Sequence, residues 1–326
     1  MEIDLMKKSF FSVYLLMVAV LFFLPACSIK KLAMNQVANA LTDQTSATVF
    51  SGDNDPELVG DALPFAIKLY ESLMVANPSH QGLKLKTGSL YIMYANAFLQ
   101  TPALMLPESD FKMQEFNYKR AKKLYLRGRD IVLSALEHKY SGFKQNLQKK
   151  LFAQALTATS KKDVPLLYWA GAGWLGAYAI DPFDMDLGMT MPAAAALMNR
   201  VLVLEENYAA GAIHEFYVLY YGSLPEYMGG SLQKAREHFN KAIAISSGKS
   251  STPYIALATT VSVKEQNLDE FQSLLKQALA IDPNIDPENR LLNILNQRKA
   301  LWLLEHADDF FLETEVTNNE NKEQGL

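Results

Sequence analysis

Apolar residues recur along most of this chain at the spacing of one helix face. From Leu58 to about Ala307 they return every three or four positions, and no stretch in that region alternates as a half-buried strand does. Asn-Pro, Asp-Pro and Gly-Gly pairs interrupt the pattern and mark turns. The pattern predicts about eleven helices, near residues 57–76, 81–99, 111–139, 143–159, 164–180, 191–206, 209–222, 231–247, 252–265, 267–281 and 288–308.

Short links between helices favour antiparallel neighbours, and part of the chain also repeats itself. Ala235, Phe239 and Ala242 have the spacing found in the second helix of a tetratricopeptide repeat (TPR), and Ala278 and Pro283 continue the pattern about one repeat later. One unusually long helix and an insertion break the period. The prediction is therefore an all-α, irregular TPR-like solenoid of helical hairpins, whose curved wall encloses a concave face or a channel.

The N-terminus has the layout of a secretory signal peptide. A pair of lysines precedes an uncharged apolar run at residues 10–23, which is short for a membrane span. Leu24-Pro-Ala-Cys27 then resembles the bacterial lipobox, so residues 1–26 are expected to be removed and Cys27 to carry a lipid anchor in the bilayer. The alternative is an ordinary signal peptide that happens to contain the chain's single cysteine.

The remaining segments complete the expected domain organisation. Residues 27–56 are expected to hold the lipidated N-terminus, a short amphipathic helix and a polar loop at 42–51. Residues 57–308 form the TPR-like domain, and the acidic, Asn-rich residues 309–326 form a disordered tail. The formal net charge of −4 over 326 residues shows no strong bias, so the sequence does not indicate nucleic acid as a partner.

Three short motifs suggest chemistry but are better explained as parts of helices. Gly171 to Gly176 fits G-x-G-x-x-G, yet the helix that follows is too short for a dinucleotide fold. His214-Glu215 lacks the second histidine of a zinc helix, because Val218 occupies that position. Gly52 to Leu58 resembles part of a calcium loop, but Asp55 suits a helix N-cap better. No cofactor, metal site or catalytic residues are predicted, and an enzyme such as a hydrolase is the least supported hypothesis.

Aromatic side chains gather in three helical segments, at 91–98, 168–178 and 216–227. Most of them are expected in the core. Because Tyr and Trp carry a polar tip on an apolar body, they also suit a ligand pocket with a few hydrogen-bonding points.

Five strings together resemble one family, the T-components of TRAP transporters, which are TPR-containing bacterial lipoproteins. The resemblance spans about residues 27–307, nearly all of the expected mature chain. The strings are Gly52-Asp-Asn-Asp-Pro-Glu-Leu-Val-Gly-Asp61 with Ala62-Leu-Pro-Phe65, Gly88-Ser-Leu-Tyr-Ile-Met-Tyr-Ala-Asn-Ala-Phe98, Tyr168-Trp-Ala-Gly-Ala-Gly-Trp174, His214-Glu-Phe-Tyr217, and Gly229-Gly-Ser231 with Ala235-Arg-Glu-His-Phe-Asn-Lys-Ala242.

The resemblance implies a periplasm-facing lipoprotein that works beside a TRAP solute-binding protein (the P component) and a membrane permease. It also implies a channel through the helical body and a homo-oligomer, for example a trimer. The aromatic content suggests a small hydrophobic or organic-acid ligand. Ser28, where an aspartate would signal retention in the inner membrane, favours the outer membrane. The alternative function is a generic TPR scaffold for cell-envelope assembly.

Residues in or beside these strings are the candidates for contact with the channel or a partner. They are Asp53, Asp55, Glu57, Tyr94, Asn96, Trp169, Trp174, His214 and Tyr221.

Overall fold

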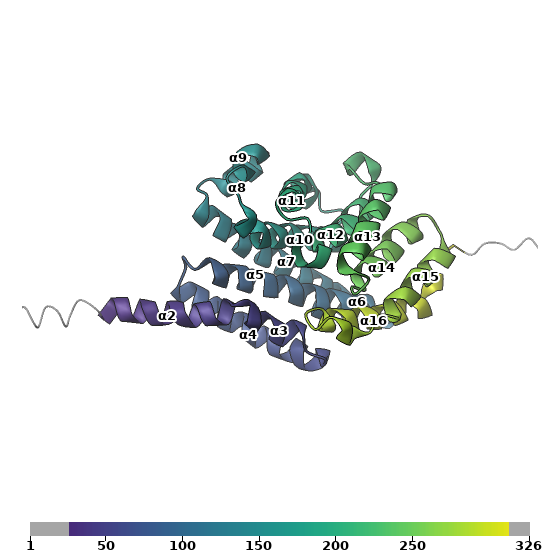
Figure 1. Ribbon diagram of the computed structural model, residues 1–326. Helices are drawn as coiled ribbons and strands as arrows, with labels where there is room; N and C mark the ends of the chain where they lie inside the picture. The colour runs from purple at the N-terminus through teal and green to yellow at the C-terminus, as the bar shows by residue number, and fades with distance from the viewer. Residues whose placement is uncertain (1–25, 313–326) are drawn as a thin grey trace, which may run out of the picture.

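The computed structural model describes the backbone of residues 26–312, with side chains described at 33–43 and 48–312. This part of the chain is mostly helical and contains no strand, which confirms the all-α prediction (Figure 1). The expected signal peptide and the end of the acidic tail lie outside it. The helices are α2 Ala26–Thr42, α3 Gln44–Ser51, α4 Pro56–Ala76, α5 Gln81–Ala95, α6 Thr101–Leu104, α7 Phe111–Lys139, α8 Phe143–Gln148, α9 Phe152–Leu156, α10 Val164–Ile180, α11 Met185–Leu204, α12 Ala212–Ser223, α13 Leu232–Ser246, α14 Thr252–Leu257, α15 Leu268–Leu279 and α16 Arg290–Glu305.

Several boundaries differ from the predicted ones for local reasons. The segment 42–51, predicted as a loop, contains the helix α3. The predicted helix at 143–159 is two short helices, because Lys150 has a φ of 60° between them. Helix α11 begins at Met185, six residues before the predicted start, because the Asp184 side chain caps it by accepting a 2.9 Å hydrogen bond from the Leu187 amide. Its Pro192 lies inside the helix rather than at its start.

Two helices continue through a wider, π-helical turn. Helix α5 runs through Asn96–Gln100 into α6, and α14 continues through Ala258–Ser262. Single π-helical turns often lie at functional sites because they change the direction in which side chains project. The first of these turns places Asn96, Ala97 and Phe98 against the cavity described below.

The central layer consists of α5, α7, α10 and α11, packed as neighbours in that order. Close crossing of α5 and α7 depends on Gly88 and Gly128, since a Cβ at either position would lie within 2.7 Å of the other glycine's carbonyl oxygen. Gly176 likewise faces the Tyr125 ring, at a distance of 2.4 Å for the added Cβ. The small residues of the GxGxxG string therefore serve helix packing, as the sequence predicts.

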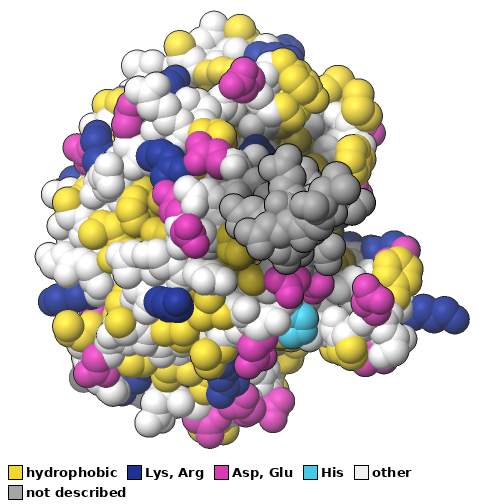
Figure 2. All heavy atoms as spheres, turned by 90° about the vertical axis from the view of Figure 1, so that its right-hand side faces the viewer, with side chains coloured by type: hydrophobic (Ala, Val, Ile, Leu, Met, Phe, Trp, Pro, Cys, Tyr) yellow, Lys and Arg dark blue, Asp and Glu magenta, His cyan; other side chains and the backbone are white. Residues whose placement is uncertain are grey.

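The two ends of the array meet, so the helices form a closed ring. The contacts pass from α4 through α5, α10, α12, α14 and α15 to α16, and α16 returns to α3 and α4 (Figure 1). Arg290 donates a 2.9 Å hydrogen bond to the Gly52 carbonyl oxygen, and Arg298 pairs with Glu57. Leu291 joins the apolar cluster of α4 and α5. Figure 2 shows the C-terminal end of this ring, where acidic and basic side chains are scattered among apolar ones.

Candidate functional site

A cavity of about 250 Å³ lies inside the ring and opens to the surface. Residues from distant parts of the sequence form its wall, including Ser51 at the end of α3 and residues 288–295 at the start of α16. The lining residues are Ser51, Met93, Asn96, Ala97, Phe98, Tyr168, Trp169, Tyr208, Ala209, Ala210, Ala212, Glu215, Ser250, Glu288, Asn289, Leu291, Leu292 and Leu295. Because both ends of the array contribute, the cavity depends on closure of the ring.

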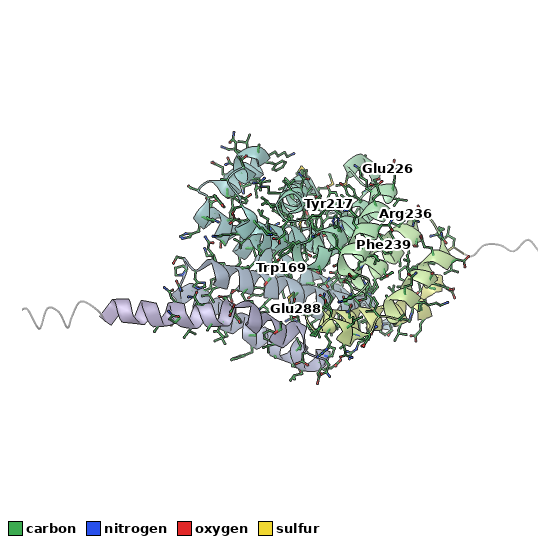
Figure 3. The ribbon with its side chains drawn as sticks, viewed as in Figure 1. Trp169, Tyr217, Glu226, Arg236, Phe239 and Glu288 are labelled. Carbon is green, nitrogen blue, oxygen red and sulfur yellow. The ribbon has the colours of Figure 1, made fainter. Side chains whose placement is uncertain are left out.

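Aromatic rings form one wall of the cavity. Tyr168 and Trp169, at the start of α10, contact each other edge to face with ring centroids 5.6 Å apart. Tyr208 packs on Tyr168 at 5.2 Å. Figure 3 places Trp169 near the middle of the molecule, with Glu288 on the side of α16. Burial raises the pKa of Tyr208 to about 12 and that of Tyr168 further, so both phenols stay neutral at ordinary pH.

The backbone beside these rings is strained. Ala209 and Ala210 have φ angles of 46° and 54°, in the left-handed region that costs a non-glycine residue about 1 kcal/mol or more. Gly211 follows with a φ of 94°. Strained residues of this kind gather at ligand sites, and the first two line the cavity.

Ala210→Gly is expected to stabilise the protein by roughly 1 kcal/mol, because glycine adopts this conformation without a steric cost. Thermal unfolding followed by circular dichroism measures the change. The matched control is Ala172→Gly in the helical interior of α10, which is expected to destabilise by a similar amount. Destabilisation by both variants would show that residue 210 is not strained.

Glu215 is the more buried of the two carboxyl groups in the cavity wall, and it is not among the site residues predicted from the sequence. Its Oε1 accepts a 2.7 Å hydrogen bond from the Ser250 hydroxyl. Burial raises the pKa of Glu215 to about 7, against the smaller opposing effect of that hydrogen bond. The carboxyl is therefore poised between its neutral and charged forms near neutral pH. A second carboxyl, Glu288, is exposed at the rim.

Of the sequence-predicted site residues, Asn96 and Trp169 line the cavity. Tyr94 lies behind this wall, stacked on Phe98 at 5.9 Å and beneath the Arg120 guanidinium at 5.7 Å. The structure thus brings three of the candidates to one place, from α5, its π-helical extension and α10.

Trp174 lies elsewhere, in a groove of about 440 Å³ between α7, α8 and α11. Its indole N–H donates a 2.8 Å hydrogen bond to Thr190, and the Arg129 guanidinium covers its ring at 4.7 Å. Lys144 and Lys150 also line this groove.

His214 and Tyr221 belong to a cluster between α12 and α13. His214 is fully buried, with its Nδ1 2.8 Å from the Nδ1 of His238, so one ring donates and the other accepts. Burial, the neighbouring His214 and Lys241 lower the pKa of His238 to about 4. Tyr221 stacks on Tyr217 at 5.4 Å and on His238 at 5.6 Å.

The three acidic candidates before and within α4 hold the start of that helix. The Asp55 side chain caps it by accepting a 2.9 Å hydrogen bond from the Leu58 amide, and Asp53 accepts one from the Asp55 amide. Glu57 joins the ring closure through Arg298. Contact of these residues with a partner stays a prediction. So does lipidation of Cys27, whose side chain lies outside the described ones.

Comparison with known proteins identifies the family. The family model for the TRAP transporter T-component matches residues 52–311, which is most of the chain. The chain belongs to the TRAP transporter T-component family. The match begins directly after α3 and ends just after α16, so it covers α4 to α16 and leaves α2 and α3 outside. A protein of uncharacterised function from Treponema pallidum (strain Nichols) is 38% identical over 302 residues, which are 88% of this chain and 94% of that protein.

This T-component is thus an accessory component of a TRAP transporter, and its family is associated with a membrane transport system. Among residues 26–312, α11 is long and apolar enough to cross a membrane by length and composition alone. However, Leu187, Met191, Leu197 and Val201 on this helix are buried in the central core. Packing against α10 therefore accounts for this buried face of the helix, whereas Met185, Met189 and Val203 on the same helix are exposed.

Proposed function

We propose that this T-component, anchored by acylated Cys27 on the periplasmic side of a membrane, binds a P component and holds a small hydrophobic or organic-acid solute inside its ring. The observation that carries the proposal is the cavity, which is walled by aromatic side chains and closed by contacts between the two ends of the array. A preformed apolar cavity with a few polar groups is the usual form of a small-molecule site. The outer membrane is the proposed place of the anchor.

We also propose a homo-oligomer such as a trimer. Helix α4 supports it, because Leu58, Phe65 and Leu69 lie on one face of this helix and are 59%, 73% and 43% exposed. An apolar helix face left in water favours contact with another protein surface. The mass of the detergent-solubilised protein, measured by analytical ultracentrifugation, distinguishes a monomer from a trimer.

The test is a pull-down from solubilised native envelope with the full-length protein as bait, read by protein mass spectrometry. A TRAP-type solute-binding protein is expected as the main captured partner. Cell-wall enzymes or outer-membrane assembly factors in its place would support the scaffold hypothesis and contradict the transport one. In the same cells, Cys27→Ser is expected to move the protein from the membrane to the soluble fraction. If it stays in the membrane, the anchor assignment is wrong.

A further inference from the structure

The cavity contains carboxyl groups without a balancing basic group. Among the described residues that line it, Glu215 and Glu288 are acidic and none is Lys, Arg or His. An organic anion inside would meet two carboxyls and no cation. Since an unpaired charge away from water is costly, this charge balance disfavours a carboxylate ligand and favours a positively charged one.

The aromatic wall has the same preference. The faces of Trp169, Tyr168 and Tyr208 carry negative charge density and attract a cation placed over them. No guanidinium or ammonium of the described residues is recorded over these three rings, whereas Tyr94, Trp174 and Tyr221 outside the cavity each have one. Aromatic faces beside a carboxylate are the chemistry with which proteins recognise organic ammonium groups.

Glu215 has a free position for such a group. Its one recorded hydrogen bond, from Ser250, engages Oε1, and the side chain lies partly open toward the cavity. Asn96 and Asn289 offer two further polar side chains in the lining, while Leu292 and Leu295 on α16 give an apolar surface.

We propose that the cavity takes an organic cation, an ammonium group on an apolar body, with the ammonium beside Glu215 and the body against Trp169 and the leucines of α16. This rests on the proposed function, whose solute it assigns to a chemical class. The proposed solute is then an amine or a quaternary ammonium compound rather than an organic acid.

The affinity of the cavity for an ammonium compound should increase with pH. An ammonium neighbour stabilises the charged form of Glu215, so binding displaces the proton that the buried carboxyl holds near pH 7, and affinity increases from pH 6 to pH 8. A carboxylate ligand would need that proton, and its affinity would decrease over the same range.

The other titratable groups around Glu215 keep their charge in this range or lie apart from it. Tyr168 and Tyr208 stay neutral, and Glu288 lies apart from Glu215, exposed at the rim. His214 precedes Glu215 but directs its ring to His238. Lys299, one turn after Leu295 on α16, is not among the residues that line the cavity, and burial lowers its pKa.

Titration calorimetry of the full-length protein with octylammonium, octanol and octanoate at pH 6 and pH 8 tests the assignment. The three probes share one apolar body and differ in the head group, and octylammonium is charged at both pH values. We expect octylammonium to bind about tenfold more tightly than octanol or octanoate at pH 8, and more tightly at pH 8 than at pH 6.

Glu215→Gln is expected to lose this tenfold preference and the pH dependence while octanol binding stays unchanged. The matched control is Glu226→Gln, an exposed glutamate outside the lining (Figure 3), which should bind as the wild type does. Equal binding of octanol and octylammonium, or an unchanged Glu215→Gln variant, overturns the assignment.

Tighter binding of octanoate with an affinity that falls above pH 7 would overturn the cation and keep the proposed solute-binding function, with Glu215 as a proton donor to an acid. If none of the three probes binds, the solute-binding part of the proposed function fails as well.

Discussion

Gly88→Val is expected to destabilise the protein by about 3 kcal/mol or more. A Cβ at residue 88 would lie 2.5 Å from the Cγ2 atom of Val132 and 2.7 Å from the Gly128 carbonyl oxygen. The second contact is with backbone, so no side-chain rotation relieves it, and α5 and α7 must separate. Urea unfolding followed by circular dichroism measures the loss.

The matched control for this crossing is Gly188→Ala, in α11. The nearest atom to an added Cβ there is on the Tyr178 ring at 3.8 Å, an ordinary contact distance. Because alanine favours the helix over glycine by roughly 1 kcal/mol, this variant should be as stable as the wild type or more so. An unchanged unfolding midpoint for Gly88→Val would mean that α5 and α7 do not cross as closely as described.

Helical periodicity predicted the interior of the fold best. The predicted bounds of α7 and α10, at 111–139 and 164–180, agree with the structure because both helices end at strong local signals. The start of α11 was missed because the Asp184 cap, seven residues before the predicted start at residue 191, was not recognised. Ring closure could not be derived from local pattern at all. It depends on contacts such as Arg290 with Gly52, which lie far apart in sequence.

The cavity was only partly predictable for the same reason. Trp169 and Asn96 were selected from strings that carry the family resemblance, and both line it. Glu215 belongs to one of these strings and to an incomplete zinc motif, but it was not selected as a site residue. A usable signal was present, because Glu215 is the single charged residue within the apolar segment Ala212–Ser223. A lone carboxyl in such a helix is either paired or has a shifted pKa.

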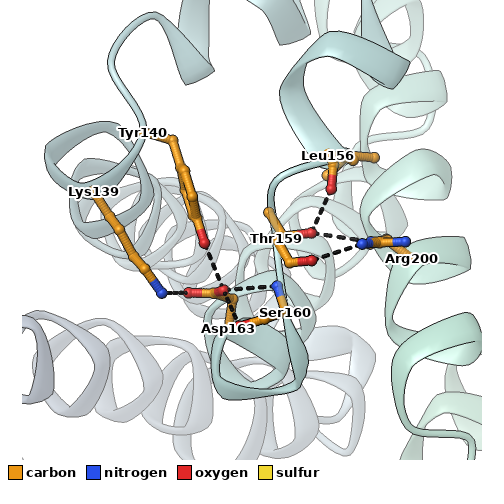
Figure 4. A network of polar contacts seen from close by, with 7 residues as sticks. All are labelled: Lys139, Tyr140, Leu156, Thr159, Ser160, Asp163 and Arg200. Carbon is orange, nitrogen blue, oxygen red and sulfur yellow. Dashed lines mark hydrogen bonds and ion pairs between the residues drawn. The ribbon is translucent and has the colours of Figure 1, made fainter.

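A buried carboxylate joins the end of α7 to the start of α10 (Figure 4). Asp163 is 1% exposed and accepts hydrogen bonds from Lys139 at 2.6 Å, Tyr140 at 2.8 Å and the Ser160 amide at 2.9 Å. Beside it, Arg200 of α11 donates to the Thr159 carbonyl oxygen at 2.6 Å. The network thus fixes the turn that positions α10, and with it the aromatic wall of the cavity.

Asp163→Ala is expected to destabilise the protein by about 2 kcal/mol, because Lys139, Tyr140 and the Ser160 amide lose a buried charged acceptor, while the partly exposed Lys139 ammonium can still reach water. Chemical unfolding at pH 7 measures this difference. The control is Asp61→Asn, an exposed aspartate on α4, for which a change within about 0.5 kcal/mol is expected. A loss for Asp163→Ala as small as that of the control would show that the network does not hold the turn.

The same substitution should also change how stability depends on pH. Burial alone would raise the pKa of Asp163, but the hydrogen bonds from Lys139, Ser160 and Tyr140 outweigh it and leave this pKa below its ordinary value. A carboxyl with a lowered pKa in the folded state stabilises the fold above its unfolded pKa of about 4, and this contribution disappears as the pH falls through the folded value. The difference between wild type and Asp163→Ala should therefore be constant from pH 8 to about pH 5 and shrink below pH 4. A difference that stays constant down to pH 2 would mean that packing, rather than the charge of Asp163, stabilises this turn.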